Sequence, residues 1–322
     1  MKSRLLSLFS ALALGAAASG CGEALGPAPT PDGPIVGFSQ IETDSSWRSA
    51  MVESAEAEAR RRGYELRISD AQHQQNYQIS GLRSFVAQGV DIIVLAPTVE
   101  TGWDSVLAEV QNAGIPVVLV DRLVDVDDES LYVTAVGSDF HEEGRLAAEW
   151  IAERTGGEAR IVELRGSEGN TAAIQREAGF AEVVEEHAGM EIVASEAANF
   201  GATAAKEEIA AALETMGADG FDAIYAHNDS MGLGAIEALE EAGISPGEDI
   251  LVVSIDGSRA ALEAIIQGAL NCSVESNPVI GVELFDAIDS ILEGEEVPRR
   301  IVVPSQVFDE TNALEALPER RY

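Results

Sequence analysis

The chain has 322 residues, of which 46% are hydrophobic, a length and composition that suit two packed domains and exclude a disordered chain. Lysine and arginine total 20 and aspartate and glutamate 56, so the formal net charge is −36. Binding to a phosphate backbone needs a basic surface, and the sequence has no basic run to supply one, which argues against nucleic acid as a partner. The acidity has two open explanations, general solubility and adaptation to a saline medium.

The first residues predict an export signal. Lys2 and Arg4 form a short positive segment before an unbroken run of apolar and small residues, 5–18. That run is too short to span a bilayer comfortably, which favours a signal peptide over a membrane helix. We therefore expect residues 1–20 to be removed on export.

Small residues stand directly before Cys21, as in a bacterial lipobox, although the usual leucine three positions earlier is here Ala18. We expect the leader to be cut before Cys21 and the sulfur to be lipidated. An ordinary secretory signal cut nearby is the alternative. Residues 21–33, rich in Gly, Pro and Ala, are then a tether between the anchor and the fold.

Cys272 is the second of the two cysteines. With Cys21 modified it has no partner, so neither a disulfide nor a cysteine-based metal site is expected. Its strand-like surroundings favour a small buried side chain.

Short β-branched segments alternate with helix-patterned stretches from residue 34 onward. Segments that are apolar on both faces and separated by helices predict parallel sheets covered by helices on each side. The series then restarts, which indicates two similar α/β domains. The first series comprises strands at 35–39, 65–68, 91–95, 116–120 and 131–136, with helices within 47–62 and 78–88. The second comprises 160–164, 191–194, 223–226, 250–254 and the segment around Cys272, and a last strand is expected at 301–303.

Polar residues gather where the expected strands end. In open parallel sheets the ligand crevice lies beyond the carboxyl ends of the strands, so two sheets that face one another would aim these groups into one cleft. The residues at these ends are Gln40, Asp70, Asp121, Arg122, Asp139, Asn228, Asp229 and Asp256.

Two of the charged pairs suit a polyhydroxylated ligand. Asp121 and Arg122 follow an apolar strand directly, and a carboxylate beside a guanidinium matches adjacent hydroxyls of a sugar ring, with a structural ion pair as the alternative. Trp47 could stack on the apolar face of a sugar while Arg48 bonds its hydroxyls, or it could be a core anchor. Asp44 could accept a hydroxyl or cap the helix that follows.

The sequence offers no candidate for catalysis, a metal or a cofactor. The four histidines lack zinc-binding spacing, no nucleophile motif is present, and the acidic run 125–129 lacks the glycine pattern of a calcium loop. The glycine-rich segment 166–170 lacks the lysine of a P-loop and the spacing of a dinucleotide site. A tight turn that lets Arg176 reach the cleft is the better account of that segment.

A set of ordered motifs runs through the chain, at 36–40, 46–48, 83–91, 96–97 with 101–103, 121–122, 225–229 and 254–257. With these motifs the chain resembles the periplasmic sugar-binding proteins of ABC importers, the ribose- and galactose-binding group related to LacI-type regulator cores, and within that group most closely the galactofuranose-binding branch. The resemblance covers nearly all of 34–322. It implies a periplasmic binding protein type I fold, with two Rossmann-like lobes, a hinge of three crossings and a ligand cleft between the lobes.

The resemblance also implies the lobe bounds and the binding set. The N-terminal lobe is 34–137 plus 277–302, and the C-terminal lobe is 138–276 plus 303–322. Glu275 is similar to a further polar contact at the hinge. The expected ligand-binding residues are Gln40, Asp44, Trp47, Arg48, Asp121, Arg122, Arg176, Asn228, Asp256 and Glu275.

The implied function is that of a substrate-binding lipoprotein that closes around a monosaccharide, a pentose or hexose such as galactofuranose, and delivers it to a membrane permease without catalysing a reaction. We expect an exported monomer, periplasmic or at the cell surface, held to the membrane by its lipid alone. A sugar-sensing receptor that feeds a chemotaxis or kinase system is the alternative. A LacI-type regulator would need a helix-turn-helix in the place of the signal and tether.

Overall fold

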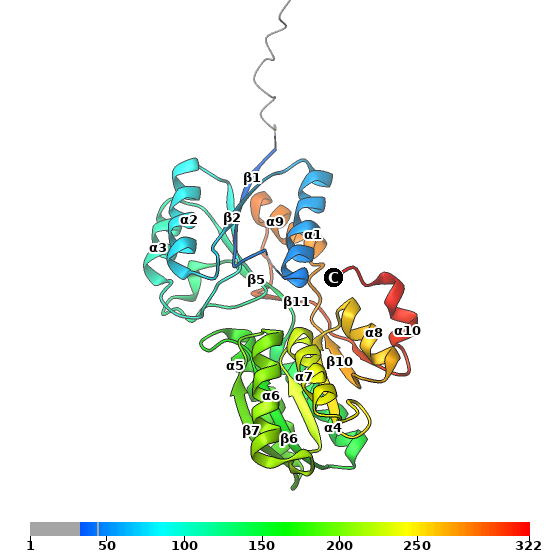
Figure 1. Cartoon of the computed structure of the whole chain (residues 1–322). Coiled ribbons are helices and arrows are strands. Elements are labelled where there is room, and N and C mark those ends of the chain that lie inside the picture. The colour runs from blue at the N-terminus through cyan, green and yellow to red at the C-terminus, as the bar shows by residue number, and fades with distance from the viewer. Residues whose placement is uncertain (1–32, 44) are drawn as a thin grey trace, which may run out of the picture.

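The fold is taken from a computed structural model, which describes residues 33–43 and 45–322 (Figure 1). The predicted signal peptide, the tether with Cys21, and Asp44 lie outside the described residues. Figure 1 shows two α/β lobes, one above the other, joined by the segments that cross between them.

The first lobe is built on a six-stranded sheet in which every pairing is parallel, in the order β11-β5-β4-β3-β1-β2. The strands are β1 (Ile35–Gln40), β2 (Glu65–Asp70), β3 (Ile92–Leu95), β4 (Val117–Val120), β5 (Thr134–Gly137) and β11 (Arg300–Val302). The helices are α1 (Ser46–Arg62), α2 (Gln75–Gln88), α3 (Asp104–Asn112) and α9 (Gly281–Glu293), with the short 3-10 helix η1 (Glu129–Leu131).

The second sheet has the order β12-β10-β9-β8-β6-β7, and only β12 runs antiparallel to its neighbour. The strands are β6 (Glu158–Arg165), β7 (Gly189–Ala197), β8 (Ala223–Ala226), β9 (Leu251–Asp256), β10 (Cys272–Glu275) and β12 (Val307–Asp309). The helices are α4 (Phe140–Thr155), α5 (Thr171–Glu186), α6 (Ala202–Met216), α7 (Asp229–Glu241), α8 (Arg259–Gln267) and α10 (Ala313–Ala316), with the 3-10 helices η2 (Ala218–Gly220) and η3 (Leu317–Glu319).

Alternation along the central strands explains the layered architecture. In β3, Ile92 and Val94 face the core beneath α1 and α9, whereas Ile93 and Leu95 face the core beneath α2 and α3. All four side chains are fully buried, as expected for a parallel strand with helices on both sides. The predicted fold of two parallel-sheet lobes is therefore confirmed.

The chain crosses between the two sheets three times, between β5 and α4, between β10 and α9, and between β11 and β12. The strand expected at 301–303 is β11 of the first sheet, whereas β12 of the second sheet was not expected. The lobe bounds 34–137 plus 277–302 and 138–276 plus 303–322 stay a proposal, which this division of the strands supports.

Two other expectations concern buried and apolar segments. Cys272 is fully buried in β10, as expected of a small core residue, and burial raises the pKa of its thiol. Among the described residues, no helix combines the length and the apolar character that a membrane crossing requires.

Helices α4 and α5 pack against each other at two glycines. A Cβ on Gly144 would lie 2.2 Å from the carbonyl oxygen of Arg176, and a Cβ on Gly179 would lie 2.0 Å from that of His141. These contacts are too short for any side chain, so both helices need glycine at the crossing. Because Arg176 lies on α5, this packing also fixes where its side chain lies relative to α4.

Replacing Gly179 with alanine should therefore destabilise the protein by about 1–3 kcal/mol, the usual cost of an overpacked core. The measurement is the urea unfolding midpoint of the purified variant. Glu186→Ala, an exposed position on the same helix, is the matched control and should change stability by less than about 0.5 kcal/mol. An unchanged midpoint for Gly179→Ala would contradict this prediction, because it would mean that α4 and α5 can move apart without loss of stability.

Candidate functional site

A cavity of about 630 Å³ lies between the two lobes, a volume within the range of small-molecule sites. Most of the predicted site residues line it. Those on the first lobe are Trp47, Arg48, Asp121 and Arg122, and those on the second are Arg176, Asn228 and Asp256.

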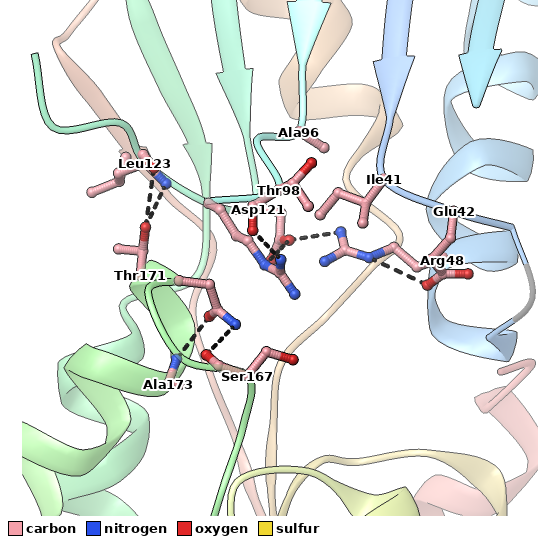
Figure 2. A network of polar contacts seen from close by, with 12 residues as sticks. Ile41, Glu42, Arg48, Ala96, Thr98, Asp121, Leu123, Ser167, Thr171 and Ala173 are labelled. Carbon is pink, nitrogen blue, oxygen red and sulfur yellow. Dashed lines mark hydrogen bonds and ion pairs between the residues drawn. The ribbon is translucent and has the colours of Figure 1, made fainter. Parts of the chain in front are cut away.

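Asp121 is the centre of the first-lobe wall. It follows β4 directly and is buried with a left-handed backbone, φ +63°, which turns the chain sharply at the strand end. Its Oδ2 lies 2.6 Å from Nη1 of Arg48 and 3.7 Å from Nε of Arg122. Figure 2 shows Arg48 reaching from α1 to this carboxylate, with Glu42 on its other side. One carboxylate therefore orients two guanidinium groups at the cavity wall.

Arg122 is held by a longer ion pair to Asp121 than Arg48 is, and by one hydrogen bond. Its Nη1 donates to the carbonyl oxygen of Thr98 at 3.2 Å, and its Nε makes no hydrogen bond within the described residues. Burial, together with the neighbouring Arg48 guanidinium, lowers the pKa of Arg122 to about 9, which still leaves it charged at neutral pH. The guanidinium is thus a largely buried cation, 12% exposed, whose hydrogen-bonding capacity is only partly used.

Trp47 is anchored as well as exposed to the cavity. Its indole N–H donates to the carbonyl oxygen of Ser276 at 2.6 Å, in the crossing segment after β10. The guanidinium carbon of Arg48 lies 4.8 Å from the ring centroid. The ring lines the cavity and also packs against the first-lobe core, so it contributes to the core, and its stacking on a sugar stays a prediction.

Arg176 dominates the wall contributed by the second lobe. Glu143 Oε2 accepts from its Nε at 2.9 Å, and the carbonyl oxygen of His227 accepts from its Nη1 at 2.6 Å. Its Nη2 lies 4.0 Å from Oδ1 of Asp256. Burial raises the pKa of Glu143, and burial with the nearby Asp229 carboxylate raises the pKa of Asp256 well above its ordinary value. Arg176 therefore stands between two buried acidic groups.

Asn228 lines the cavity but has a structural task. Its Oδ1 accepts from the backbone N–H of Met231 at 2.9 Å, which caps α7, and its Nδ2 donates to the carbonyl oxygen of Phe200 at 3.3 Å. The second hydrogen on Nδ2 is left for a ligand.

The structure does not bring Gln40 and Glu275 to the cavity wall. Gln40 is fully buried at the end of β1, and its Oε1 accepts from the backbone N–H of Ile41 at 2.9 Å. Glu275 is buried too, and its carboxylate pairs with Arg320. Both positions follow or end a strand as expected, but each side chain turns to a protein partner instead of the cleft.

Phe200 is a lining residue that the sequence interpretation missed. It follows β7, and both Asn199 and Phe200 have left-handed backbones, φ +53° and +61°. Its ring lies over Gly166, where a Cβ would come within 2.0 Å of the ring. The guanidinium carbon of Arg122, on the other lobe, lies 5.7 Å from the ring centroid. The sequence feature that could have indicated its place in the cavity is an aromatic residue soon after a strand.

The lobes also touch beside the cavity. The hydroxyl of Thr171 donates to the carbonyl oxygen of Leu123 at 3.1 Å and accepts from the backbone N–H of the same residue at 3.1 Å, as Figure 2 shows. The backbone N–H of Glu100 donates to the carbonyl oxygen of Gly169 at 3.1 Å. These contacts join a loop of each lobe across the cleft, so the structure is a closed arrangement.

A buried histidine supports the floor of the second lobe. The backbone N–H of Gly166 donates to Nδ1 of His227 at 3.3 Å, so the ring proton is on Nε2, which donates to Oε1 of Glu163 at 3.1 Å. Burial lowers the pKa of His227, because a charged imidazolium would be poorly solvated there.

The cavity presents charged donors, carboxylates and the rings of Trp47, Phe200 and Tyr322, a set suited to binding a neutral ligand with many hydroxyls. Within residues 33–43 and 45–322, no group of three or more His, Cys, Asp or Glu side chains is arranged to hold a metal ion.

Comparisons with known proteins agree with this geometry. The periplasmic binding protein domain family matches residues 36–296. The galactofuranose-binding protein YtfQ of Escherichia coli is 40% identical over 89% of this chain and 91% of its own length.

Two solved structures are similar. The arabinose-transporter binding protein of Shewanella sp. ANA-3, bound to α- and β-L-arabinofuranose, has a TM-score of 0.86 at 44% identity, covering 89% of this chain and 95% of that one. A Mycobacterium smegmatis structure with β-D-fucofuranose has a TM-score of 0.85 at 43% identity, covering 88% and 94%. The chain belongs to the periplasmic binding protein domain family.

The depressed pKa of His227 predicts acid sensitivity. A histidine in the unfolded chain titrates at about pH 6.5, so below that pH the unfolded chain binds a proton that the folded protein does not bind at His227. The stability that comes from burying neutral His227 is therefore complete above about pH 6.5 and is lost as the pH falls below it. His227→Gln removes the titrating group. Between about pH 7.5 and about pH 5.5, the wild type should therefore lose free energy of unfolding relative to His227→Gln, as measured by urea denaturation. His141→Gln, at a half-exposed histidine, should follow the wild type. Parallel pH profiles of the wild type and His227→Gln would contradict the prediction.

Proposed function

We propose that this protein is the sugar-binding component of an ABC importer and that it catalyses no reaction itself. The observation that carries the proposal is the convergence of three arginines, from both lobes, on one cavity that also holds carboxylates and aromatic rings; Arg48 and Arg176 are buried and the side chain of Arg122 is 12% exposed. Arg48 and Arg122 share the carboxylate of Asp121, and Arg176 lies close to Asp256. Such pairs offer donors and acceptors at the spacing of neighbouring hydroxyls.

Binding would occur by closure of the hinge. In an open form each wall would face water, and a sugar that touches both walls would favour the closed form, because only closure makes both sets of contacts. Trp47 and Phe200, on opposite lobes, supply apolar surfaces for the two faces of the ring. A sugar that lacks one hydroxyl would leave a buried charge unpaired, which gives the site its selectivity.

The ligand class is a pentose or hexose, with furanose forms favoured. Support comes from the relatives, of which one is a galactofuranose-binding protein and two are solved with arabinofuranose and fucofuranose. The chain resembles these proteins over nearly their whole length, and the lining residues other than Tyr322 fall within 36–296, the part that the family matches.

We propose further that the protein is an exported monomer, that Cys21 is lipidated after removal of residues 1–20, and that the closed form docks on a membrane permease. The support for the anchor is the sequence around Cys21 alone. A tethered binding protein meets its permease at a raised local concentration.

Titration calorimetry against pentoses and hexoses, including sugars with a large furanose fraction, tests the binding function. The wild type should bind at least one of them. Arg122→Ala should weaken that binding about 10- to 150-fold, the loss expected when hydrogen bonds from a charged donor are removed. Arg83→Ala removes an exposed arginine that pairs with Glu109, neither of which lines the cavity, and it should bind like the wild type. Failure of the wild type to bind any pentose or hexose would overturn the proposed function.

The two cysteines allow a controlled test of the anchor. Cys21→Ser should abolish incorporation of labelled fatty acid and release the exported protein from the membrane fraction, since serine lacks the sulfur that would be acylated. Cys272→Ser changes a buried cysteine within the fold and should leave the label and the fractionation unchanged. Two outcomes would count against lipidation of Cys21. In one, both variants incorporate the label equally, and in the other neither the variants nor the wild type incorporates it.

A further inference from the structure

Residues 320–322 return to the interlobe cavity after η3, and Figure 1 shows this end of the chain beside the first lobe. Tyr322 is one of the lining residues and is 7% exposed. It is distant in sequence from every other residue of the wall that it joins. No motif in the sequence pointed to it.

Three contacts fix this segment in place. Arg320 Nη1 pairs with the carboxylate of Glu275 and also donates to the hydroxyl of Tyr322 at 2.9 Å. The guanidinium carbon of Arg320 lies 4.4 Å from the ring centroid of Phe308. The backbone oxygen of Tyr322 accepts from the N–H of Arg259 at 2.7 Å, at the start of α8. The tyrosine ring is therefore held from both its backbone and its hydroxyl.

The direction of these hydrogen bonds is determined by the donors available. Arginine has no acceptor, so its N–H must point to the phenol oxygen of Tyr322. The phenol proton is then directed to the carbonyl oxygen of Asp256, 3.2 Å away, which also accepts from the backbone N–H of Ser276 at 3.2 Å. Burial raises the pKa of Tyr322, so the phenol keeps this proton.

Asp256 needs such support because its backbone is strained. Its φ of +132° lies in a region that residues other than glycine rarely adopt, and such conformations persist only where the surroundings hold them. The same backbone sets the direction of its carboxylate, which lies 4.0 Å from Arg176.

We propose that Tyr322 is a positioning residue of the sugar site, which holds the strained backbone of Asp256 so that its carboxylate meets the ligand beside Arg176. Glu275 serves the site through Arg320 and Tyr322 and does not touch the ligand. This inference rests on the proposed function, since it requires a sugar that the wild type binds.

The test is a double-mutant cycle measured by calorimetry with that sugar. Tyr322→Phe keeps the ring and removes only the hydroxyl, and it should weaken binding about 2- to 12-fold, as expected for the loss of one neutral hydrogen bond. In an Asp256→Asn background, where the carboxylate is already lost, the same change should weaken binding less than about twofold, because coupled residues are not additive. Glu275→Gln should weaken binding in the same direction and add little to Tyr322→Phe.

Arg321→Ala, the exposed neighbour on the same segment, is the control and should bind like the wild type. Thermal unfolding of each variant checks that it is folded at the temperature of the titration. Unchanged binding by Tyr322→Phe overturns the proposal, and so does an equal loss in both backgrounds, which would make Tyr322 a direct contact. A wild type that binds no sugar overturns the proposed function instead.

Discussion

Buried arginine is the constraint on which the rest of the cleft depends. Removing a guanidinium from water costs several kcal/mol. An ion pair offsets this cost only when its geometry is good and further hydrogen bonds satisfy the remaining donors. Arg176 meets this requirement with Glu143 at 2.8 Å and the carbonyl oxygen of His227 at 2.6 Å. Arg48 lies 2.6 Å from Asp121, but its Nη1 makes no hydrogen bond among the described residues. Arg122 meets the requirement only in part, because its Nε has no hydrogen-bond partner among the described residues. A ligand oxygen at this wall would complete a set that the protein has already desolvated.

The same cleft concentrates backbone strain. Six residues other than glycine have a positive φ in the described part of the chain, and all but Gln72 line the cavity. Those five are His73, Asp121, Asn199, Phe200 and Asp256. They follow or end strands, where the chain must turn sharply if a side chain is to face the opposite lobe. Strain of this kind is stored where surrounding contacts fix it, and the rigid sheets behind the cleft provide such contacts.

Sequence patterns predicted the features that depend on the strands and missed those that depend on contacts between residues distant in sequence. Strands such as β3 are apolar on both faces, so the parallel sheets followed from the pattern. Five of the eight polar residues expected at strand ends, including Asp121 and Asp256, line the cavity, whereas Gln40, Asp70 and Asp139 do not. Glu275 also ends a strand, but Arg320, 45 residues away, takes its carboxylate, which no local pattern reveals. Phe200 and Tyr322 lie outside the strands, and their places depend on Gly166 and Arg320 beneath them.

The contacts between the lobes bear on how a ligand would control the proposed closure. Beside the cavity they include two hydrogen bonds of Thr171 to Leu123 and one between the backbones of Glu100 and Gly169. Each is a neutral hydrogen bond with a net value of about 1 kcal/mol, and closure must also order the loops that make them. Moving a two-state equilibrium from mostly open to mostly closed takes about 5.5 kcal/mol of differential binding. These few neutral contacts fall short of that, whereas charged hydrogen bonds from both walls to one sugar, at about 1.5–3 kcal/mol each, reach it with only a few bonds. Under the proposed function, lobes joined by these contacts would separate readily without a ligand and would be held together by a ligand that bridges Arg122 and Arg176.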